Sequence, residues 1–202
     1  MSDAAARARR GRPGHDLDAV LTAAVRLFNE RGYDATSMDD LARRLNITKS
    51  SIYHHVRGKQ ELLRLAVGHA LDGLDEAMAQ VQEMAGASAL ERLESLVRLS
   101  VLVLAERLPY VTLLLRVRGN TDVETEALER RRLYDQQVTA LVKQAQAEGA
   151  IRADVDPATA ARLLFGMVNS LIEWYSPSRG GAGQLAATVT AIAFDGLRTR
   201  MP

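Results

Sequence analysis

Apolar residues recur at three- and four-residue spacing along almost the whole chain, and this periodicity constrains the fold most strongly. Such spacing places apolar side chains on one face of an α-helix, whereas a half-buried strand would need strict alternation, which is scarce here. Only 4% of the residues are aromatic. The sequence therefore predicts an all-α protein. With 202 residues, of which 47% are apolar, the chain can build one sizeable core or a small domain beside a larger one.

Composition removes several classes of protein. The chain has no cysteine, which excludes disulfides, thiolate metal sites and cysteine nucleophiles. No apolar run reaches the length that a bilayer span needs, and the first residues, MSDAAARARRGRP, lack a hydrophobic signal core. The motifs G-x-S-x-G, H-E-x-x-H and the Walker loop are absent. We expect a cytoplasmic protein that is not an enzyme and uses no cofactor, metal or membrane.

Positive charge is concentrated near the start of the chain. Residues 1–60 contain eleven Lys and Arg against seven Asp and Glu, whereas the remainder contains fifteen against eighteen. This asymmetry suits a polyanionic partner at one end, although a modest excess on a solvated surface is the commoner meaning.

Capping and breaking residues divide the chain into predicted helices. The first predicted helix runs from Leu17 to Arg31, and the second from a cap at Thr36 or Ser37 to Asn46. A third begins at Thr48 and lasts barely two turns. A long fourth helix begins at Lys59 and ends near Gly86. Later helices are predicted over residues 90–104, from Pro109 to Gly119, from a Thr121–Glu124 capping box to Gly149, over 158–175 and over 185–199, with a loop at 176–183.

The second and third predicted helices are separated only by residues 46–48, which is the connection length of a DNA-binding helix-turn-helix. At about 100° per residue, Ile52 and Val56 share one face of the third helix, which we expect to be buried. Ser50 and His54 then point away from the core. Short hydroxyls and an imidazole can hydrogen-bond base edges, while a nearby tyrosine and lysines can hold phosphates.

The stretch ATSMDDLARRLNITKSSIYHHVRGKQELL resembles the N-terminal domain of TetR-family transcriptional repressors. The resemblance covers residues 16–64 and departs from many members at Ser50 and Val56. It implies a basic flexible arm over residues 1–15, a helix-turn-helix domain over 16–60 and a ligand-binding, dimerising helical bundle over 61–202. The DNA contacts expected from the resemblance and the helical wheel come from Thr36, Thr48, Lys49, Ser50, Ser51, Tyr53, His54, His55 and Lys59, and from Arg9, Arg10 and Arg12 of the arm.

The expected ligand site is less specific, because a bundle core and a bundle cavity use the same side chains. The candidates are Tyr110, Arg116, Arg118, Phe165, Asn169 and Trp174. Arg116 and Arg118 end a helix, where solvent exposure is the default and an anion-binding mouth is the alternative. Asn169 lies among apolar residues, so its amide needs a partner from a ligand or a symmetry mate. Adjacent His54 and His55 diverge by about 100° and do not suit a metal.

The resemblance implies a homodimeric repressor that binds double-stranded DNA at an inverted-repeat operator and dimerises through its last two helices. A small hydrophobic effector, either an acid or its coenzyme A thioester (acyl-CoA), would release it. One alternative is a multidrug-type repressor that binds lipophilic cations, for which Glu173 is the candidate acid. Another is a helical interaction protein that does not read DNA.

Overall fold

The computed structural model describes residues 16–195, and these residues form helices joined by turns, with no β-strand. The all-α prediction is thus confirmed. The chain divides into two compact units between Leu62 and Leu63. Helix α4 begins in the first unit and continues into the second.

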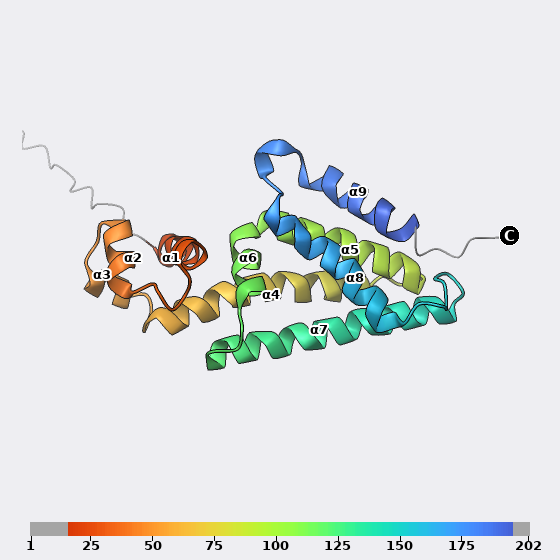
Figure 1. Cartoon of the computed structure of the whole chain (residues 1–202), viewed down its shortest axis with the longest axis horizontal. Helices are drawn as coiled ribbons and strands as arrows, with labels where there is room; N and C mark the ends of the chain where they lie inside the picture. The colour runs from red at the N-terminus through yellow and green to blue at the C-terminus, as the bar shows by residue number, and fades with distance from the viewer. Residues whose placement is uncertain (1–15, 196–202) are drawn as a thin grey trace, which may run out of the picture. The chain divides into compact units, whose positions relative to one another are not determined.

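The first unit holds α1 (Leu17–Arg31), α2 (Met38–Leu45) and the short α3 (Lys49–Tyr53), followed by the start of α4 (Lys59–Gln82) (Figure 1). α2 packs against both α1 and α3. The core of this unit is built from the apolar faces that the spacing predicts, with Leu27, Leu41 and Ile52 almost fully buried. Removing these side chains from water is the main force that holds three such short helices together, because isolated helices of this length are marginal.

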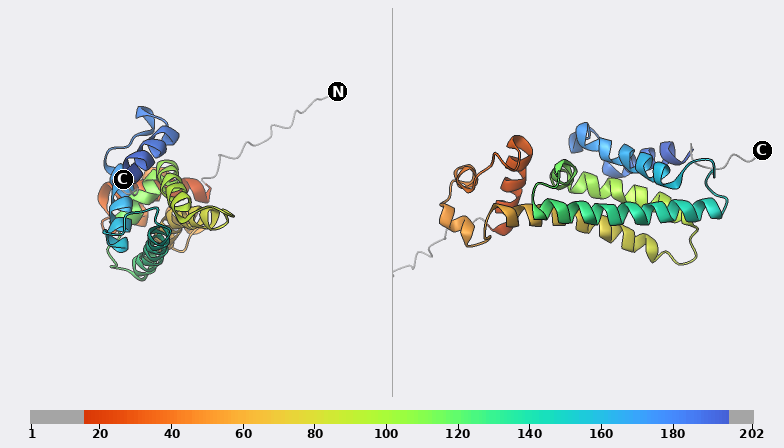
Figure 2. Two further views of the ribbon diagram at one scale, coloured as in Figure 1. Left: turned by 90° about the vertical axis from the view of Figure 1, so that its right-hand side faces the viewer. Right: turned by 60° about the horizontal axis from the view of Figure 1, so that its bottom comes forward.

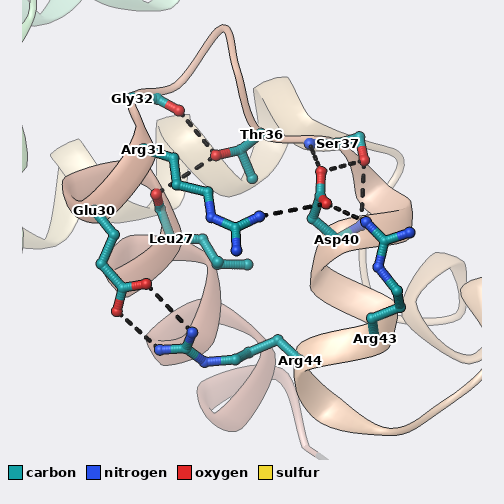
Figure 3. Close-up of polar contacts among 9 residues, drawn as sticks. All are labelled: Leu27, Glu30, Arg31, Gly32, Thr36, Ser37, Asp40, Arg43 and Arg44. Carbon is teal, nitrogen blue, oxygen red and sulfur yellow. Dashed lines mark hydrogen bonds and ion pairs between the residues drawn. The ribbon is translucent and has the colours of Figure 1, made fainter.

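Side-chain caps fix where these helices begin. Ser37, not Thr36, caps α2: its hydroxyl oxygen accepts a hydrogen bond from the Asp40 backbone N–H at 3.1 Å, and the Asp40 carboxylate accepts one from the Ser37 N–H at 2.9 Å. Asp40 also pairs with Arg31 and Arg43 (Figure 3). Helix α2 ends at Asn46, which adopts the left-handed conformation with φ of 53°.

The second unit is a bundle formed by the rest of α4 with α5 (Ala89–Glu106), α6 (Leu108–Arg116), α7 (Asp122–Ala147), α8 (Pro157–Ser170) and α9 (Ala182–Asp195). α5 contacts α6, α7, α8 and α9. Its sequence is apolar nearly all round, which fits a helix that other helices surround. α7 packs against α8 as well as α5, and Figure 2 shows α7 extending along one side of this unit.

Three features differ from the sequence predictions. Thr121 caps α7 as expected, but the Glu124 carboxylate does not reach back to the Thr121 N–H, as a capping box requires. It is buried and instead accepts the N–H of Asn120 at 2.6 Å, so it holds the preceding turn. The helix predicted over 158–175 stops at Ser170, and a 3-10 turn follows over Leu171–Glu173. The last helix begins at Ala182 rather than 185 and is described to Asp195; its predicted end lies beyond the described residues.

Candidate nucleic-acid interface and ligand cavity

Helix α3 presents a polar outer face over a single buried anchor. The side chain of Ile52 is completely buried, and Val56, just beyond the helix, is buried beside it. Lys49, Ser50 and His54 are exposed on the other side. Tyr53 is 47% exposed although its ring is large and apolar. A short helix with an apolar anchor and freely accessible donors and acceptors can enter a groove without giving up its packing.

The start of α3 is held by paired hydroxyls. Thr48 is the N-cap, and its oxygen accepts a hydrogen bond from the Ser51 N–H at 3.2 Å. The Thr48 and Ser51 hydroxyl oxygens lie 2.8 Å apart. These two residues thus fix the first turn of α3, so that its exposed neighbours are presented in a defined direction.

An acidic residue lies beside the exposed face of α3. The Lys49 ammonium is 3.0 Å from the Asp39 carboxylate of α2, and both side chains are well exposed. The hydrogen bond with Asp39 raises the pKa of Lys49. A DNA phosphate would compete with Asp39 for the Lys49 ammonium, so Lys49 can exchange its ion pair with Asp39 for one with a phosphate.

Lys59 and Thr36 are engaged within the first unit. The Lys59 ammonium donates a hydrogen bond to the Tyr33 carbonyl at 2.8 Å and lies 4.2 Å from the centre of the Tyr33 ring. The Thr36 side chain is buried, and its hydroxyl donates to the Gly32 carbonyl at 2.8 Å (Figure 3). Both residues therefore stabilise the turn between α1 and α2. An ammonium has three donors, so Lys59 retains capacity for a further acceptor.

The second unit contains a small cavity of about 50 Å³. Its lining comes from α4 to α8 and is mostly apolar. The lining residues are Leu74, Ser100, Leu104, Val111, Leu114, Leu115, Arg131, Tyr134, Asp135, Phe165, Val168 and Asn169. A mainly apolar cavity with a few convergent polar groups is the usual form of a small-molecule site.

Ser100 and Tyr134 supply the buried polar groups of this cavity. The Ser100 hydroxyl donates to the Leu96 carbonyl at 2.7 Å, and its oxygen lies 3.1 Å from the Tyr134 oxygen. Since Ser100 has one hydrogen, which Leu96 receives, the phenol must be the donor in the second contact. Burial raises the pKa of Tyr134 well above its usual range, so the phenol is neutral. Its oxygen can still accept a hydrogen bond from a ligand.

A second, larger hollow of about 510 Å³ runs between α7 and α8. We call it the basic groove. It is lined by Arg132, Asp135, Gln136, Val138, Thr139, Ala140, Lys143, Ala158, Ala161, Arg162 and Phe165. Asp135 and Phe165 border both the cavity and the groove. Partial burial raises the pKa of Asp135, an effect that the charges of Arg131 and Arg162 oppose.

Comparison with known proteins identifies the family. Residues 20–66 match the family model for bacterial regulatory proteins of the tetR family, and residues 86–197 match the tetracyclin repressor-like C-terminal domain. The second match alone spans more than half of the chain. The chain belongs to the TetR family. It is thus a transcriptional regulator with a DNA-binding helix-turn-helix domain.

Three relatives resemble this TetR-family chain over most of its length. The structure of SCO3833, a TetR-family member from Streptomyces coelicolor A3, is 52% identical over 89% of this chain and 91% of that chain, with a TM-score of 0.79. The transcriptional repressor KstR2 of Mycolicibacterium smegmatis is 27% identical over 92% of each chain. AibR, solved with isovaleryl coenzyme A and operator DNA, is 28% identical over 88% of this chain and 97% of that chain, with a TM-score of 0.74. Other curated relatives match over 50 to 65 residues, so this chain spans only 27% to 35% of their length.

The DNA-binding residues expected from the sequence lie in three kinds of place in this TetR-family regulator. Those exposed on or next to α3 are Thr48, Lys49, Ser50, Tyr53, His54 and His55, with Ser51 half-buried among them. Thr36 and Lys59 are engaged with backbone carbonyls as described above. Arg9, Arg10 and Arg12 lie outside the described residues.

Only two of the six expected ligand residues line the cavity. Phe165 and Asn169 do so. Arg116 and Arg118 are exposed, in keeping with their position at a helix end. Tyr110 packs edge-on against His69 of α4, with ring centres 4.6 Å apart. Trp174 is 54% exposed.

Trp174 lies outside the cavity lining because α8 ends four residues before it, and the 3-10 turn changes the direction in which later side chains point. The candidate site therefore excludes Tyr110, Arg116, Arg118 and Trp174.

Sequence reasoning missed the charged residues at the site. Arg131 and Asp135 were not among the candidates because α7 carries many charges, which indicate a solvated face, and Arg162 was not because it is the one charged residue of the otherwise apolar α8. Two features of the sequence do indicate the inward-facing residues of the cavity. Ser100 is a lone hydroxyl within an apolar helix, and Tyr134, Val138 and Val142 recur at four-residue spacing, which marks the inward face of α7.

Among residues 16–195, no helix is long and apolar enough to cross a membrane. In the same range, no group of three or more His, Asp or Glu side chains is arranged to hold a metal ion.

Proposed function

We propose that this TetR-family regulator is a repressor that binds an inverted-repeat operator as a homodimer and is released by a small hydrophobic effector. The observation that carries the proposal is the exposed polar face of α3, anchored by the fully buried Ile52. Such a helix, reached by a three-residue turn from α2, has the geometry of a recognition helix in the major groove. DNA binding in the cytoplasm follows from this role.

The proposed contacts divide into readout and positioning. Ser50 and His54 present a hydroxyl and an imidazole on the outermost face of α3, where they can reach base edges. Lys49 and Tyr53 flank them and can contact phosphates. Thr48, Ser51, His55 and Lys59 complete the proposed surface on its edges, and the arm arginines Arg9, Arg10 and Arg12 are proposed to follow the DNA backbone. The buried Thr36 supports this surface from behind, through the turn between α1 and α2.

Dimerisation through α8 and α9 is supported by their uncovered apolar side chains. Leu163 is 68% exposed, Ile192 is 63% exposed and Met167 is 37% exposed. Large apolar side chains that stay exposed on neighbouring helices are typical of a surface that a partner covers. Two copies packed through these helices would form a four-helix bundle and place two recognition helices about one DNA turn, ~34 Å, apart.

The proposed effector is a hydrophobic acid or its coenzyme A thioester. The mainly apolar cavity supports a hydrophobic group, and Arg131 at its wall supports an anionic or polar end. AibR, whose structure holds isovaleryl coenzyme A, is similar over most of this chain. The effector must bind the DNA-free arrangement better than the DNA-bound one, because only differential affinity shifts the equilibrium.

A multidrug-type repressor remains the second candidate because an acid does lie at the cavity. That acid is Asp135 rather than Glu173, which is exposed and does not line the cavity. Arg131 lines the same cavity and three more cations line the adjoining groove, so the site as a whole favours an anion over a cation.

Footprinting on the DNA upstream of the regulator's own gene tests the proposal. We expect a protected inverted repeat, with binding weakened at high salt because phosphate contacts release counterions. His54→Ala should weaken specific binding about 5- to 100-fold, the value of one good base contact. Gln137→Ala, an exposed change on α7, serves as the control. If the wild-type protein protects no site, the interaction-protein alternative replaces this proposal.

A further inference from the structure

The cavity and the basic groove adjoin each other, because two residues line both of them. Phe165 and Asp135 line both hollows. The Phe165 ring is held edge-on against Tyr134, with ring centres 5.4 Å apart. Rotating one half-buried aromatic ring would therefore connect the apolar cavity of about 50 Å³ with the open groove of about 510 Å³.

The apolar part is too small for a long chain. An apolar cavity of roughly 150 Å³ can hold a benzene molecule. The cavity here has about one third of that volume. Movement of Phe165 would enlarge it, but the remaining walls come from five packed helices, which resist expansion. The apolar group that fits is therefore short, of only a few carbon atoms.

The groove carries net positive charge, part of which acts on two carboxylates of the fold: Arg162 acts on Asp135, and Arg162 and Lys143 act on Asp156 at the start of α8. Its lining holds Arg132, Lys143 and Arg162 against one acid, Asp135. Within residues 16–195, none of these three cations makes a hydrogen bond or a close ion pair. Their neighbour Arg130 provides the contrast, since its guanidinium lies 2.9 Å from Asp72 and 2.5 Å from Asp75.

The spacing of these cations suits more than one anionic group. Arg132 and Lys143 are eleven residues apart on α7, which corresponds to about 16 Å along the helix. Arg162 lines the same groove from α8. A single carboxylate could neutralise only one of these cations. A ligand with a diphosphate and a separate phosphomonoester, as in coenzyme A, could engage all three.

We infer that the basic groove binds the phosphates of a coenzyme A thioester, and that the short acyl group of this thioester enters the cavity past Phe165. The inference rests on the proposed function and narrows its effector from hydrophobic acids in general to short-chain acyl-CoA. In this arrangement Arg132, Lys143 and Arg162 hold the head, while Ser100, Tyr134 and the apolar walls surround the tail.

Calorimetric titration of the purified full-length protein tests the inference with three probes that share one acyl group. These are isobutyryl-CoA, the isobutyryl thioester of N-acetylcysteamine and isobutyric acid. The second probe keeps the thioester but lacks every phosphate, so the difference in affinity reports the groove. We expect isobutyryl-CoA to bind at least about tenfold more tightly than either of the others. ATP, which carries phosphates but no acyl group, should bind at least about tenfold more weakly than isobutyryl-CoA.

The double variant Arg132→Ala/Arg162→Ala should weaken isobutyryl-CoA binding by about 10- to 100-fold and leave the N-acetylcysteamine thioester unchanged. The matched control is Arg118→Ala, which removes an exposed arginine outside both hollows. A loss below about twofold in the double variant, or equal binding of ATP and isobutyryl-CoA, would overturn the inference. Footprinting of the same samples shows separately whether the operator is bound, so a failed inference can be told from a failed repressor assignment.

Discussion

At the scale of single residues, Gly73 determines how closely α4 and α5 approach. A Cβ atom added at this position would lie 2.8 Å from Val103 Cγ1 and 2.8 Å from Arg107 Nη1. Arg107 is itself fixed, because its guanidinium donates to the His69 carbonyl at 2.7 Å and pairs with Glu76 at 3.2 Å. The absence of a side chain at Gly73 is therefore needed for this contact.

Gly73→Ala should lower the free energy of unfolding by about 1–3 kcal/mol, because the methyl group forces α4 and α5 apart. Gly68→Ala on the same helix is the control, since no atom lies within 4 Å of its added Cβ. Alanine normally stabilises a helix interior over glycine by up to about 1 kcal/mol, so the control should be stabilised. Urea denaturation followed by circular dichroism measures both. Equal effects of the two changes would show that the α4–α5 contact tolerates a side chain.

Asp40 links stability to pH in the first unit. Hydrogen bonds from the Ser37 hydroxyl and backbone lower its pKa to about 2 from an ordinary 3.8, with Arg43 adding to the effect. A lowered folded-state pKa gives stability that is present above the ordinary value and is lost as pH falls toward the folded value.

Asp40→Asn should therefore destabilise the protein most at neutral pH. The difference from wild type should shrink as pH falls from about 4 to about 2, because protonation removes the same charge from the wild-type carboxylate. Urea midpoints at several pH values measure the trend. A difference that is constant across this range would mean that Asp40 acts through its shape and not its charge.

At the scale of elements, the helix starts were the most predictable feature. Ser37, Thr48 and Thr121 act as N-caps because the hydrogen bond that each makes is local and can be read from the sequence. The end of α8 was not predictable, since Leu171 and Ile172 continue the apolar pattern although the backbone changes to a 3-10 turn. The position at which α8 ends depends on tertiary packing, which local sequence patterns do not encode.

The candidate site was harder to predict than the helices for the same reason. α7 looks like a solvated charged helix, yet it packs against both α5 and α8, so that one of its faces is enclosed. Packing alone decides that Arg131 and Asp135 line a cavity while Arg116 and Arg118 do not. Apolar spacing located Phe165 but could not choose among the charged residues.

Arg130 ties α7 to α4. Its guanidinium is shared by Asp72 and Asp75, which lie one turn apart on α4. Arg130→Met should lower the free energy of unfolding by about 1 kcal/mol, because the pairing is partly exposed and the two acids are left to repel each other. The loss should be smaller at 1 M salt, where such charges are screened. The control is Glu83→Gln, which changes an exposed acid just after the end of α4. A salt-independent loss would point to packing of the arginine stem.

At the scale of the whole molecule, the α8–α9 surface sets the proposed assembly. Leu163→Glu combined with Ile192→Glu should convert the dimer to monomers, because two buried charges would replace two apolar contacts at each interface. Sedimentation velocity measures the change, and operator affinity should fall with it because both half-sites are then no longer bound together. The control is Leu133→Glu, which changes a leucine on α7 that is also well exposed, at 60%. A double variant that stays dimeric would place the interface elsewhere.

Because α3 is short, few of its residues contribute to the stability of the fold. The helix comprises five residues and contributes one side chain, Ile52, to the core. Exposed substitutions away from caps and buried contacts change stability by only about 0.5 kcal/mol or less. Lys49, Ser50, Tyr53 and His54 can thus be replaced almost independently of the fold. Under the role proposed for α3, single substitutions at these positions would change the operator preference while leaving the fold intact.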